Sequence, residues 1–381
     1  MPYIKFLSKK VKKTLSMKTK VLVAMSGGVD SSVALLKIIE MGYDAIGVTM
    51  KLWEYQNVGG NILNDSNCCS VGAINNAKLV CDSRDVPHYT LDFTEVFQKT
   101  VVDDFADEYM KGRTPNPCVR CNSFVKWDAF IQQADKLGAK YIATGHYADI
   151  KKMNGTLFLT KGRDPLKDQA YVLWGIPPHT LSRTLLPLGK YTKKQVRKIA
   201  RDNALETADI PESMEICFVA DNNYKRFLRD YIPDKMSAVG TGDIVDQSGK
   251  TVGTHDGYTN YTIGQRKGLG LSNPEPRYVT QIEPSRNKII IGKKEALLKK
   301  TCSISQVNWL ISSMDFPCNV EAQIRYNSSV TSAEIMKNNN EYKITFHQLQ
   351  SAVTPGQSIV FYRDDVVLGG GIIEGDIDAD E

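Results

Sequence analysis

The chain has 381 residues and a mass of 42.5 kDa, more than one ordinary hydrophobic core, which favours two or three domains. Hydrophobic residues make up 42% of it and charged residues 24%, a composition that excludes a disordered or fibrous protein. No stretch of the sequence reaches the roughly 20 apolar residues of a membrane-spanning helix. The eight cysteines are spaced unevenly, unlike the disulfide framework of a small secreted protein, so we expect a reducing, cytoplasmic location.

The net charge of +5 comes from the first 20 residues, which hold seven lysines and no acidic residue. The rest of the chain carries 41 basic and 43 acidic residues. We expect residues 1–17 to form a disordered basic arm, because they lack the apolar core of a signal peptide. Residues 151–240 carry 16 basic and 10 acidic residues. This local excess would suit a polyanion, although solvated lysines on helices are the commoner cause.

The first predicted elements are a strand, a polar turn, a helix and a second strand. Lys20–Met25 is a short apolar run typical of a buried strand, residues 33–40 predict a helix, and residues 44–50 predict the next strand. This order indicates a βαβ unit with parallel strands. The pattern continues with helix 70–83, strand 86–91, helices 94–111 and 122–136, and strand 140–144. We therefore predict a doubly wound α/β domain over residues 18–160.

The remaining chain has a different pattern. Residues 161–238 predict a small mixed domain, mainly helical, with helices at 193–203 and 223–231. Residues 239–372 contain short apolar runs separated by turn residues, which predicts an all-β region of one or two small barrels. Its predicted strands are 279–281, 288–291, 320–325, 342–346 and 358–362. Residues 373–381 form an acidic tail.

A glycine- and serine-rich turn, Ser26-Gly27-Gly28-Val29-Asp30-Ser31, joins the first strand to the first helix. The two glycines allow a tight turn in which backbone N–H groups face an anion, and the helix amino terminus favours negative charge there. Asp30 is expected to hold a Mg²⁺ ion that bridges phosphates. The turn differs from a Walker A loop because no Gly-Lys-Ser/Thr follows it. A plain Gly-Gly turn without a ligand is the alternative interpretation.

Two cysteines lie in the segment Pro115-Asn116-Pro117-Cys118-Val119-Arg120-Cys121-Asn122. We expect a helix to start just after Cys121. A thiol near a helix amino terminus, with Arg113 and Arg120 nearby, should have a lowered pKa and be partly ionised at pH 7. The C-x-x-C pattern alone fits half a zinc site, a redox pair or two Fe–S ligands. No second such pair follows, which argues against a closed zinc site.

A third cysteine, Cys217, lies 96 residues after Cys121 within the sequence 213–218, Ser-Met-Glu-Ile-Cys-Phe. A lone cysteine between apolar neighbours is ordinarily a core residue. Four further segments fall between and after these motifs: Ala143–Tyr147, Lys167–Gln169, Gly264–Gly270 and Arg325-Tyr326. Together, from about residue 18 to 372, their order and spacing resemble the bacterial tRNA-specific 2-thiouridylase (MnmA) family of the ATP pyrophosphatase superfamily.

The resemblance implies an ATP pyrophosphatase domain, a central tRNA-binding domain and a carboxy-terminal β-barrel. It implies that ATP, with Mg²⁺, activates the 2-oxygen of the wobble uridine of tRNA before sulfur replaces it. The implied ATP site comprises Ala24, Met25, Ser26, Gly27, Gly28, Val29, Asp30, Ser31, Met50 and Gly145. The implied target-base contacts are Asn116, Pro117 and Cys118, and the other tRNA contacts are His146, Lys167, Asp168, Gln169, Arg325, Tyr326 and Gln357. Cys217 is implied to carry a persulfide and Cys121 to be the second catalytic thiol.

The residue types suit this chemistry. A urea-like carbonyl is a poor electrophile, so its oxygen must be adenylated before sulfur attacks. The sulfur must come from a persulfide donor or a sulfur-relay protein, and Cys121 can release it from Cys217 by forming a disulfide. The target base must leave the anticodon stack to reach the thiols.

Other interpretations stay open from the sequence. Some family members have Asp in place of Cys118, and this chain departs from that pattern. Cys118, Cys121 and Cys217 could instead hold a [4Fe–4S] cluster. The chain could also be a different ATP pyrophosphatase that acts on a small metabolite, or a tRNA-binding protein without catalysis. The five other cysteines are expected to be structural: Cys68, Cys69, Cys81, Cys302 and Cys318.

Overall fold

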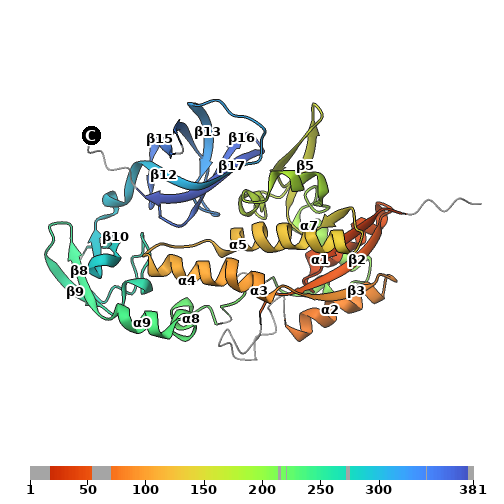
Figure 1. Cartoon of the computed structure of the whole chain (residues 1–381), viewed down its shortest axis with the longest axis horizontal. Coiled ribbons are helices and arrows are strands. Elements are labelled where there is room, and N and C mark those ends of the chain that lie inside the picture. Colours follow the sequence, from red (N-terminus) through yellow and green to blue (C-terminus); the bar gives the residue numbers. More distant parts are fainter. Residues whose placement is uncertain are drawn as a thin grey trace, which may run out of the picture.

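The structure is a computed structural model, and it describes residues 18–53, 70–212, 216–219, 221–271, 275–339 and 341–375. The predicted basic arm, Cys68, Cys69 and residues 376–381 of the acidic tail lie outside these residues. Residues 373–375, assigned to the tail, end the strand β17 (Val366–Gly375). Figure 1 shows a parallel sheet and its helices at one end of the long axis, a small sheet at the other end, and a barrel beside α4 and α5. No helix in the described ranges combines the length and the apolar character needed to cross a membrane.

The first sheet has five strands in the order β3-β2-β1-β4-β7, and every neighbouring pair is parallel. Its strands are β1 (Lys20–Ala24), β2 (Asp44–Lys51), β3 (His88–Asp92), β4 (Tyr141–Ala143) and β7 (Thr184–Leu185). The predicted doubly wound α/β class is confirmed. The last strand, β7, comes from a stretch for which the sequence predicted no strand.

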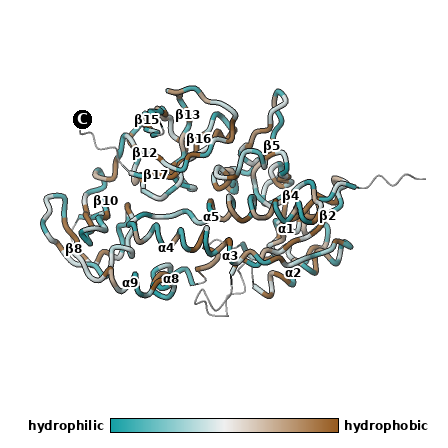
Figure 2. The backbone as a smooth tube through the Cα atoms, viewed as in Figure 1, coloured by the Kyte–Doolittle hydropathy of each residue, from teal (hydrophilic) through white to brown (hydrophobic). Residues whose placement is uncertain are grey.

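Helices cover both faces of this sheet. On one face lie α1 (Val29–Glu40), α2 (Val71–Asp82) and α7 (Lys193–Asp202). On the other lie α3 (Thr94–Phe97), η2 (Gln98–Val102), α4 (Asp103–Met110), α5 (Pro117–Arg120), η3 (Cys121–Ala129) and α6 (Phe130–Lys136). Side chains alternate along β1 accordingly: Val21 and Val23 pack against Val33 of α1, whereas Leu22 belongs to the cluster that contains Phe130. Figure 2 shows a corresponding alternation of hydrophobic and hydrophilic residues along α4.

The helix that carries the C-x-x-C motif begins earlier than the sequence suggested. It starts at Pro117, and the Asn116 side chain caps it by accepting a hydrogen bond from the Val119 amide at 3.4 Å. The expected start after Cys121 is therefore wrong. Proline at the first helical position and asparagine at the N-cap are common helix-start signals, and here they outweigh the two prolines' usual role in loops.

The elements that were not predicted include a hairpin and a short helix. Strands β5 (Ala148–Met153) and β6 (Thr156–Lys161) form a hairpin, and β6 pairs with β17 through Thr160 and Val366. Further on, α8 (Tyr224–Tyr231) matches a predicted helix, and it is followed by the unpredicted α9 (Pro233–Val239). The hairpin attaches the barrel to the α/β domain.

The carboxy-terminal half is built of two antiparallel-rich sheets, which confirms the predicted β-barrel. The small sheet contains β8 (Gly242–Asp246), β9 (Thr251–His255), β10 (Tyr278–Glu283) and β11 (Lys288–Gly292). The barrel contains β12 (Leu298–Trp309), β13 (Cys318–Gln323), β14 (Thr331–Asn338), β15 (Glu341–Ser351), β16 (Ser358–Arg363) and β17 (Val366–Gly375). Pairing of β12 with β17 closes the barrel.

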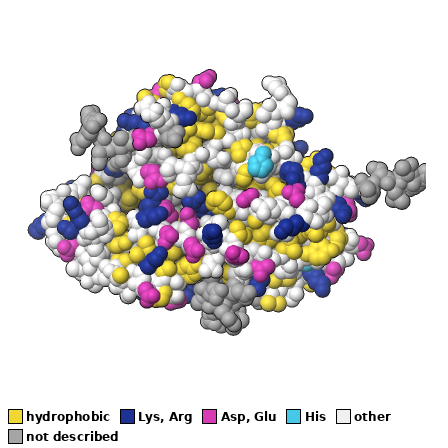
Figure 3. Space-filling view, in the orientation of Figure 1, with side chains coloured by type: hydrophobic (Ala, Val, Ile, Leu, Met, Phe, Trp, Pro, Cys, Tyr) yellow, Lys and Arg dark blue, Asp and Glu magenta, His cyan; other side chains and the backbone are white. Residues whose placement is uncertain are grey.

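The barrel contacts the segment just before α5. The Thr114 amide donates a hydrogen bond to the Pro355 carbonyl at 2.9 Å, and the Tyr171 hydroxyl donates to the Ser358 carbonyl at 2.7 Å. These contacts fix the barrel against the cysteine-bearing helix. On the face shown in Figure 3, lysine and arginine side chains are interspersed with acidic ones.

Candidate active site

The loop between β1 and α1 is built to receive an anion. Gly27 has a φ of +73°, and a Cβ added to it would lie 2.2 Å from the carbonyl oxygen of Ala73, so only glycine fits. The Ser31 hydroxyl accepts a hydrogen bond from the Ser26 amide at 3.2 Å and donates to the Gly28 carbonyl at 3.0 Å. No described side chain caps α1 at Gly28. The loop therefore presents helix N–H groups and serine hydroxyls, the donors that bind phosphate.

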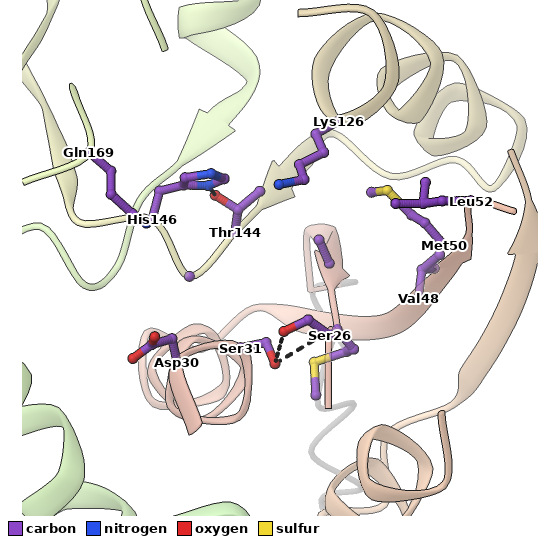
Figure 4. Close-up of a pocket in the computed structure, with 13 residues that line it drawn as sticks. Ser26, Asp30, Ser31, Val48, Met50, Leu52, Lys126, Thr144, His146 and Gln169 are labelled. Atoms are coloured by element: carbon purple, nitrogen blue, oxygen red, sulfur yellow. Dashed lines mark hydrogen bonds between the residues drawn. The ribbon is translucent and has the colours of Figure 1, made fainter. Parts of the chain in front are cut away.

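A pocket lies in front of this loop, beside the carboxyl ends of β1 and β2 (Figure 4). Most residues assigned to ATP by the resemblance line it: Ala24, Met25, Ser26, Asp30, Ser31, Met50 and Gly145. The other three, Gly27, Gly28 and Val29, belong to the adjoining loop. A Cβ on Gly145 would lie 2.9 Å from the Asp30 carbonyl carbon, so glycine allows the segment after β4 to approach α1. His146 and Gln169, assigned to tRNA, line the same pocket.

The Asp30 carboxylate is held by two side chains. Lys193, the first residue of α7, donates to its two oxygens at 2.8 and 2.7 Å, and the Tyr147 hydroxyl donates to Oδ1 at 2.7 Å. Burial and the Asp30 charge raise the pKa of Tyr147, so the hydroxyl stays protonated. Lys193 also pairs with Glu212 at 3.0 Å, and Glu212 pairs with Lys167 at 2.7 Å. A chain of alternating charges thus connects the loop between β1 and α1 (Ser26–Ser31, called the phosphate loop below) to Lys167, a residue assigned to tRNA.

His146 and Thr144 form part of the pocket wall opposite the loop. The Thr144 hydroxyl and His146 Nδ1 are 2.8 Å apart, and the rings of His146 and Trp127 are 5.4 Å apart. Burial, with a smaller effect of the Lys126 charge, lowers the pKa of His146 well below its ordinary value. The imidazole is therefore neutral at pH 7 and can form a hydrogen bond without adding charge to the pocket.

Cys118 and Cys121 occupy different environments on one helix. Cys118 is exposed, whereas Cys121 is 7% exposed and belongs to the main hydrophobic cluster. Cys121 is the first residue of the π-helical segment η3. Lys126, five residues further along η3, lines the pocket. A single helical segment therefore carries both a predicted catalytic thiol and a residue that lines the pocket beside the β1–α1 loop.

Cys217 lies against the same hydrophobic cluster as Cys121. Its neighbour Phe218 anchors it, because the Phe218 ring is fully buried and lies 5.7 Å from the ring of Phe97 and 5.2 Å from that of Phe105. Cys217 itself stays partly exposed. Cys121 and Cys217 thus border one extended hydrophobic cluster, which also reaches β1 and the barrel strand β17.

The cysteines do not form a ready metal site. Across the described ranges, no three His, Cys, Asp or Glu side chains are grouped so that they could hold a metal ion. The arrangement of Cys118, Cys121 and Cys217 therefore does not fit the ligand set of an Fe–S cluster.

Both arginines near the cysteines are paired with carboxylates. Arg113 pairs with Glu108 at 2.6 Å and with Glu374, and Arg120 pairs with Asp104 at 2.9 Å. These carboxylates offset the positive charge that the sequence suggested would favour a thiolate.

Residues assigned to tRNA from two distant segments meet beside the pocket. The Tyr326 hydroxyl donates to the Asp168 carbonyl at 3.0 Å. The Asp168 side chain accepts from the Gly162 amide at 2.7 Å, and burial raises the pKa of this carboxyl. The Gln169 side chain accepts from the Tyr147 amide at 2.9 Å. Asp168 and Gln169 thus shape the loop that carries them, and Gln169 also lines the pocket.

The segment assigned to the target base (residues 116–118, the target-base segment) starts at the N-cap of α5. Burial, with smaller effects of the Asp168 and Cys118 charges, raises the pKa of Tyr326. The Tyr326 ring lies 5.9 Å from the ring of Tyr171. Pro117 is buried behind Asn116 and Cys118, where it begins the helix.

Arg325 and Gln357 differ in orientation. Arg325 is exposed at a turn of the barrel. Gln357 instead donates hydrogen bonds to the carbonyls of Thr114 at 2.8 Å and Pro115 at 3.3 Å. Gln357 therefore holds the backbone that leads to Asn116.

Several residues of the site were given no role from the sequence: Lys126, Thr144, Tyr147, Lys193 and Glu212. Thr144 and Tyr147 belong to the segment Ala143–Tyr147, which the sequence singled out, but only Gly145 and His146 of that segment were assigned. Lys193 and Glu212 lie far along the chain from the phosphate loop, so no local pattern indicates their position. Lys126 had a usable signal, since it follows the C-x-x-C motif by five residues in a predicted helix.

Known protein families and individual proteins are similar to this chain over almost all of its described residues. Three family models match in succession: "tRNA methyl transferase HUP domain" over residues 19–221, "tRNA methyl transferase PRC-barrel domain" over 225–293 and "Aminomethyltransferase beta-barrel domain" over 299–373.

Individual proteins match over nearly their full length. A tRNA-specific 2-thiouridylase MnmA 2 from Clostridium botulinum is 43% identical over 360 residues, which cover 94% of this chain and 100% of that protein. MnmA from Carboxydothermus hydrogenoformans is 45% identical, covering 93% of this chain and 97% of that protein. MnmA from Salinibacter ruber is 44% identical, covering 94% and 95%. The chain therefore belongs to the tRNA-specific 2-thiouridylase (MnmA) family.

Proposed function

We propose that the protein is a tRNA-uridine 2-sulfurtransferase. It uses ATP to adenylate the 2-oxygen of the wobble uridine and then transfers sulfur from a persulfide on Cys217. One observation carries this proposal: η3 supplies both Cys121 and the pocket residue Lys126, so thiol and nucleotide chemistry share one helical segment.

In the first step, the phosphate loop binds the phosphates of ATP through the Ser26 and Ser31 hydroxyls and the amino end of α1. The uridine 2-oxygen forms a bond to the α-phosphorus, the bond from that phosphorus to the bridging oxygen breaks, and pyrophosphate leaves with the electron pair. The N3 proton of uridine passes to solvent. Mg²⁺ would neutralise phosphate charge, and Asp30 suits it because Oδ2, which accepts from Lys193, has lone-pair capacity for another partner.

In the second step, the terminal sulfur of the Cys217 persulfide attacks C2, and AMP leaves. The Cys121 thiolate then attacks Cys217 Sγ, which forms a Cys121–Cys217 disulfide and leaves the outer sulfur on the base. An external thiol reductant restores both thiols, and a persulfide donor reloads Cys217.

The descriptions of the matching family models name methyl transfer, whereas the names of the relatives specify thiolation. The site favours thiolation. Methyl transfer needs neither a phosphate loop nor a second thiol, and this chain has both.

The test is incubation of the protein with ATP, a persulfide donor and unmodified tRNA, followed by measurement of AMP, pyrophosphate and 2-thiouridine. We expect all three products in equal amounts. Cys217→Ser should abolish thiolation and leave ATP and tRNA binding intact, whereas Cys318→Ser in the barrel strand β13 should react like the unmodified protein.

The alternatives give different products. AMP formation without sulfur incorporation would favour a synthetase that acts on a small metabolite. Formation of neither product, with tRNA still bound, would favour a binding protein. Residual thiolation by Cys217→Ser would show that another residue donates the sulfur.

A further inference from the structure

The charge balance of the nucleotide pocket identifies a residue that the sequence motifs do not. Among the described residues that line the pocket, Asp30 and Lys126 are the ionised ones, since the lowered pKa of His146 leaves that imidazole neutral. Asp30 already has the Lys193 ammonium as its counter-ion, and Lys193 is outside the lining. Lys126 is the one lysine or arginine among the described residues that line the pocket.

The position of Lys126 is complementary to the phosphate loop. Figure 4 shows its side chain reaching into the cavity from η3, with Ser26 and Ser31 on the opposite side. Thr144 and His146 lie next to Lys126 on the same wall. A phosphate chain bound at the amino end of α1 would thus have backbone and hydroxyl donors on one side and an ammonium on the other.

We propose that Lys126 is a phosphate-binding catalytic residue of the adenylation step. The ligand class is a nucleoside triphosphate, and the proposal deepens the function proposed above, on which its catalytic part rests. As the bond between the α-phosphorus and the bridging oxygen breaks, negative charge grows on the departing pyrophosphate. An ammonium held in a half-enclosed pocket stabilises that charge more than it stabilises the bound substrate.

Lys126 lies on the same π-helical segment, η3, as the predicted catalytic thiol of Cys121. Hydrogen bonds in a π-helix join residues five apart, so Cys121 and Lys126 stand about one turn from each other along one side of η3. The helix therefore holds Lys126, which would bind the phosphates, and Cys121, which would release the sulfur, at a fixed separation.

The test compares the binding of ATP with that of adenosine. Lys126→Met should weaken ATP binding by roughly tenfold to hundredfold, the range expected for loss of a hydrogen bond to a charged group. Adenosine has no phosphate, so its Kd should be unchanged. Lys126→Arg, which keeps the charge, should recover most of the ATP affinity. Calorimetric titration of each nucleotide measures these constants without any turnover.

The matched control is Lys136→Met, which removes the exposed lysine at the end of α6, the helix that follows η3 directly, and should leave both constants unchanged. Unchanged ATP binding in Lys126→Met would overturn the proposal. Equal losses for ATP and adenosine would also overturn it, since they would show that Lys126 only maintains the pocket. Lys126→Gln repeats the test with a polar side chain in case the methionine variant does not fold.

A second readout separates this proposal from the proposed function. With tRNA present and ATP at a saturating concentration, we measure the rate of pyrophosphate release. In Lys126→Met this rate should fall by at least the factor by which the Kd for ATP rises. If the unmodified protein released no pyrophosphate with tRNA, the proposed function would fail while the binding comparison still decided the role of Lys126.

Discussion

Lys193 donates hydrogen bonds to both carboxylate oxygens of Asp30, across 163 residues of sequence, and so ties the phosphate loop to the start of α7. The lysine side chain is 11% exposed and the aspartate side chain 32% exposed. A pair this enclosed interacts more strongly than a surface pair, and loss of one partner leaves the other charge poorly solvated.

Replacing Lys193 by methionine should lower the free energy of unfolding by about 2 kcal/mol, less than for a fully enclosed pair because Asp30 keeps some solvent contact. Urea denaturation measures the change. Lys198→Met on the same helix is the control, because the exposed Lys198–Asp202 pair should contribute only about 0.3–0.5 kcal/mol. Adding Asp30→Asn to Lys193→Met should recover part of the loss. Equal effects of the two lysine variants would contradict a special role for the Asp30–Lys193 pair.

Gly27→Ala should destabilise the protein and abolish ATP binding, because the added Cβ would overlap the Ala73 carbonyl at 2.2 Å. We expect a loss of about 3 kcal/mol or more. Gly42→Ala separates overlap from backbone strain: Gly42 also has a positive φ, +84°, but a Cβ added there would have no atom within 4 Å. That variant should lose only about 1 kcal/mol. Chemical denaturation of both variants decides whether close approach, rather than φ alone, requires glycine in the loop.

The phosphate loop could be predicted from sequence because its determinants are local. Strand, glycines, serines and helix follow one another within about a dozen residues, and each has its own conformational preference. The parallel sheet could be predicted for the same reason. The counter-ion of Asp30 could not, since Lys193 begins a helix whose local pattern says only that it is amphipathic.

The attachment of the barrel to the β5–β6 hairpin could not be predicted from the sequence either. Pairing of Thr160 with Val366 depends on tertiary packing between segments about 200 residues apart. The start of the cysteine helix was different, because Asn116 and Pro117 were visible as cap and first helical residue. There the sequence contained the information, although the start expected after Cys121 did not use it.

The pKa of His146 predicts a pH dependence of stability. Burial and Lys126 lower this pKa well below 6.5, so the unfolded chain takes up a proton near pH 6.5 that the folded chain does not. Stability from the neutral imidazole is therefore fully present above pH 6.5 and is lost as the pH falls below it. In His146→Gln, the loss of stability between pH 7.5 and 5.5 should be smaller than in the unmodified protein by about 1 kcal/mol.

Urea denaturation at the two pH values measures this difference. His347→Gln in β15 is the control, because His347 is exposed and its replacement should leave the pH dependence as it was. An unchanged pH dependence in His146→Gln would mean that His146 takes up protons alike in the folded and unfolded chains.

Gln357 connects the barrel to the segment before α5, and its removal should loosen the surroundings of Cys121. In Gln357→Ala the carbonyls of Thr114 and Pro115 lose their amide donor. Since Cys121 is only 7% exposed, its alkylation requires local opening of this region. We expect iodoacetamide to modify Cys121 several times faster in the variant, as measured by mass spectrometry, whereas the already exposed Cys118 should change little.

Gln348→Ala on the outside of β15 is the matched control, and it should leave both alkylation rates unchanged. A tRNA-binding measurement then separates two roles of Gln357. If the side chain acts only by direct contact with tRNA, Gln357→Ala would weaken tRNA binding and leave Cys121 protected. Faster alkylation of Cys121 without tRNA present would instead assign to Gln357 the positioning of the target-base segment, because no bound tRNA is needed for the hydrogen bonds to Thr114 and Pro115.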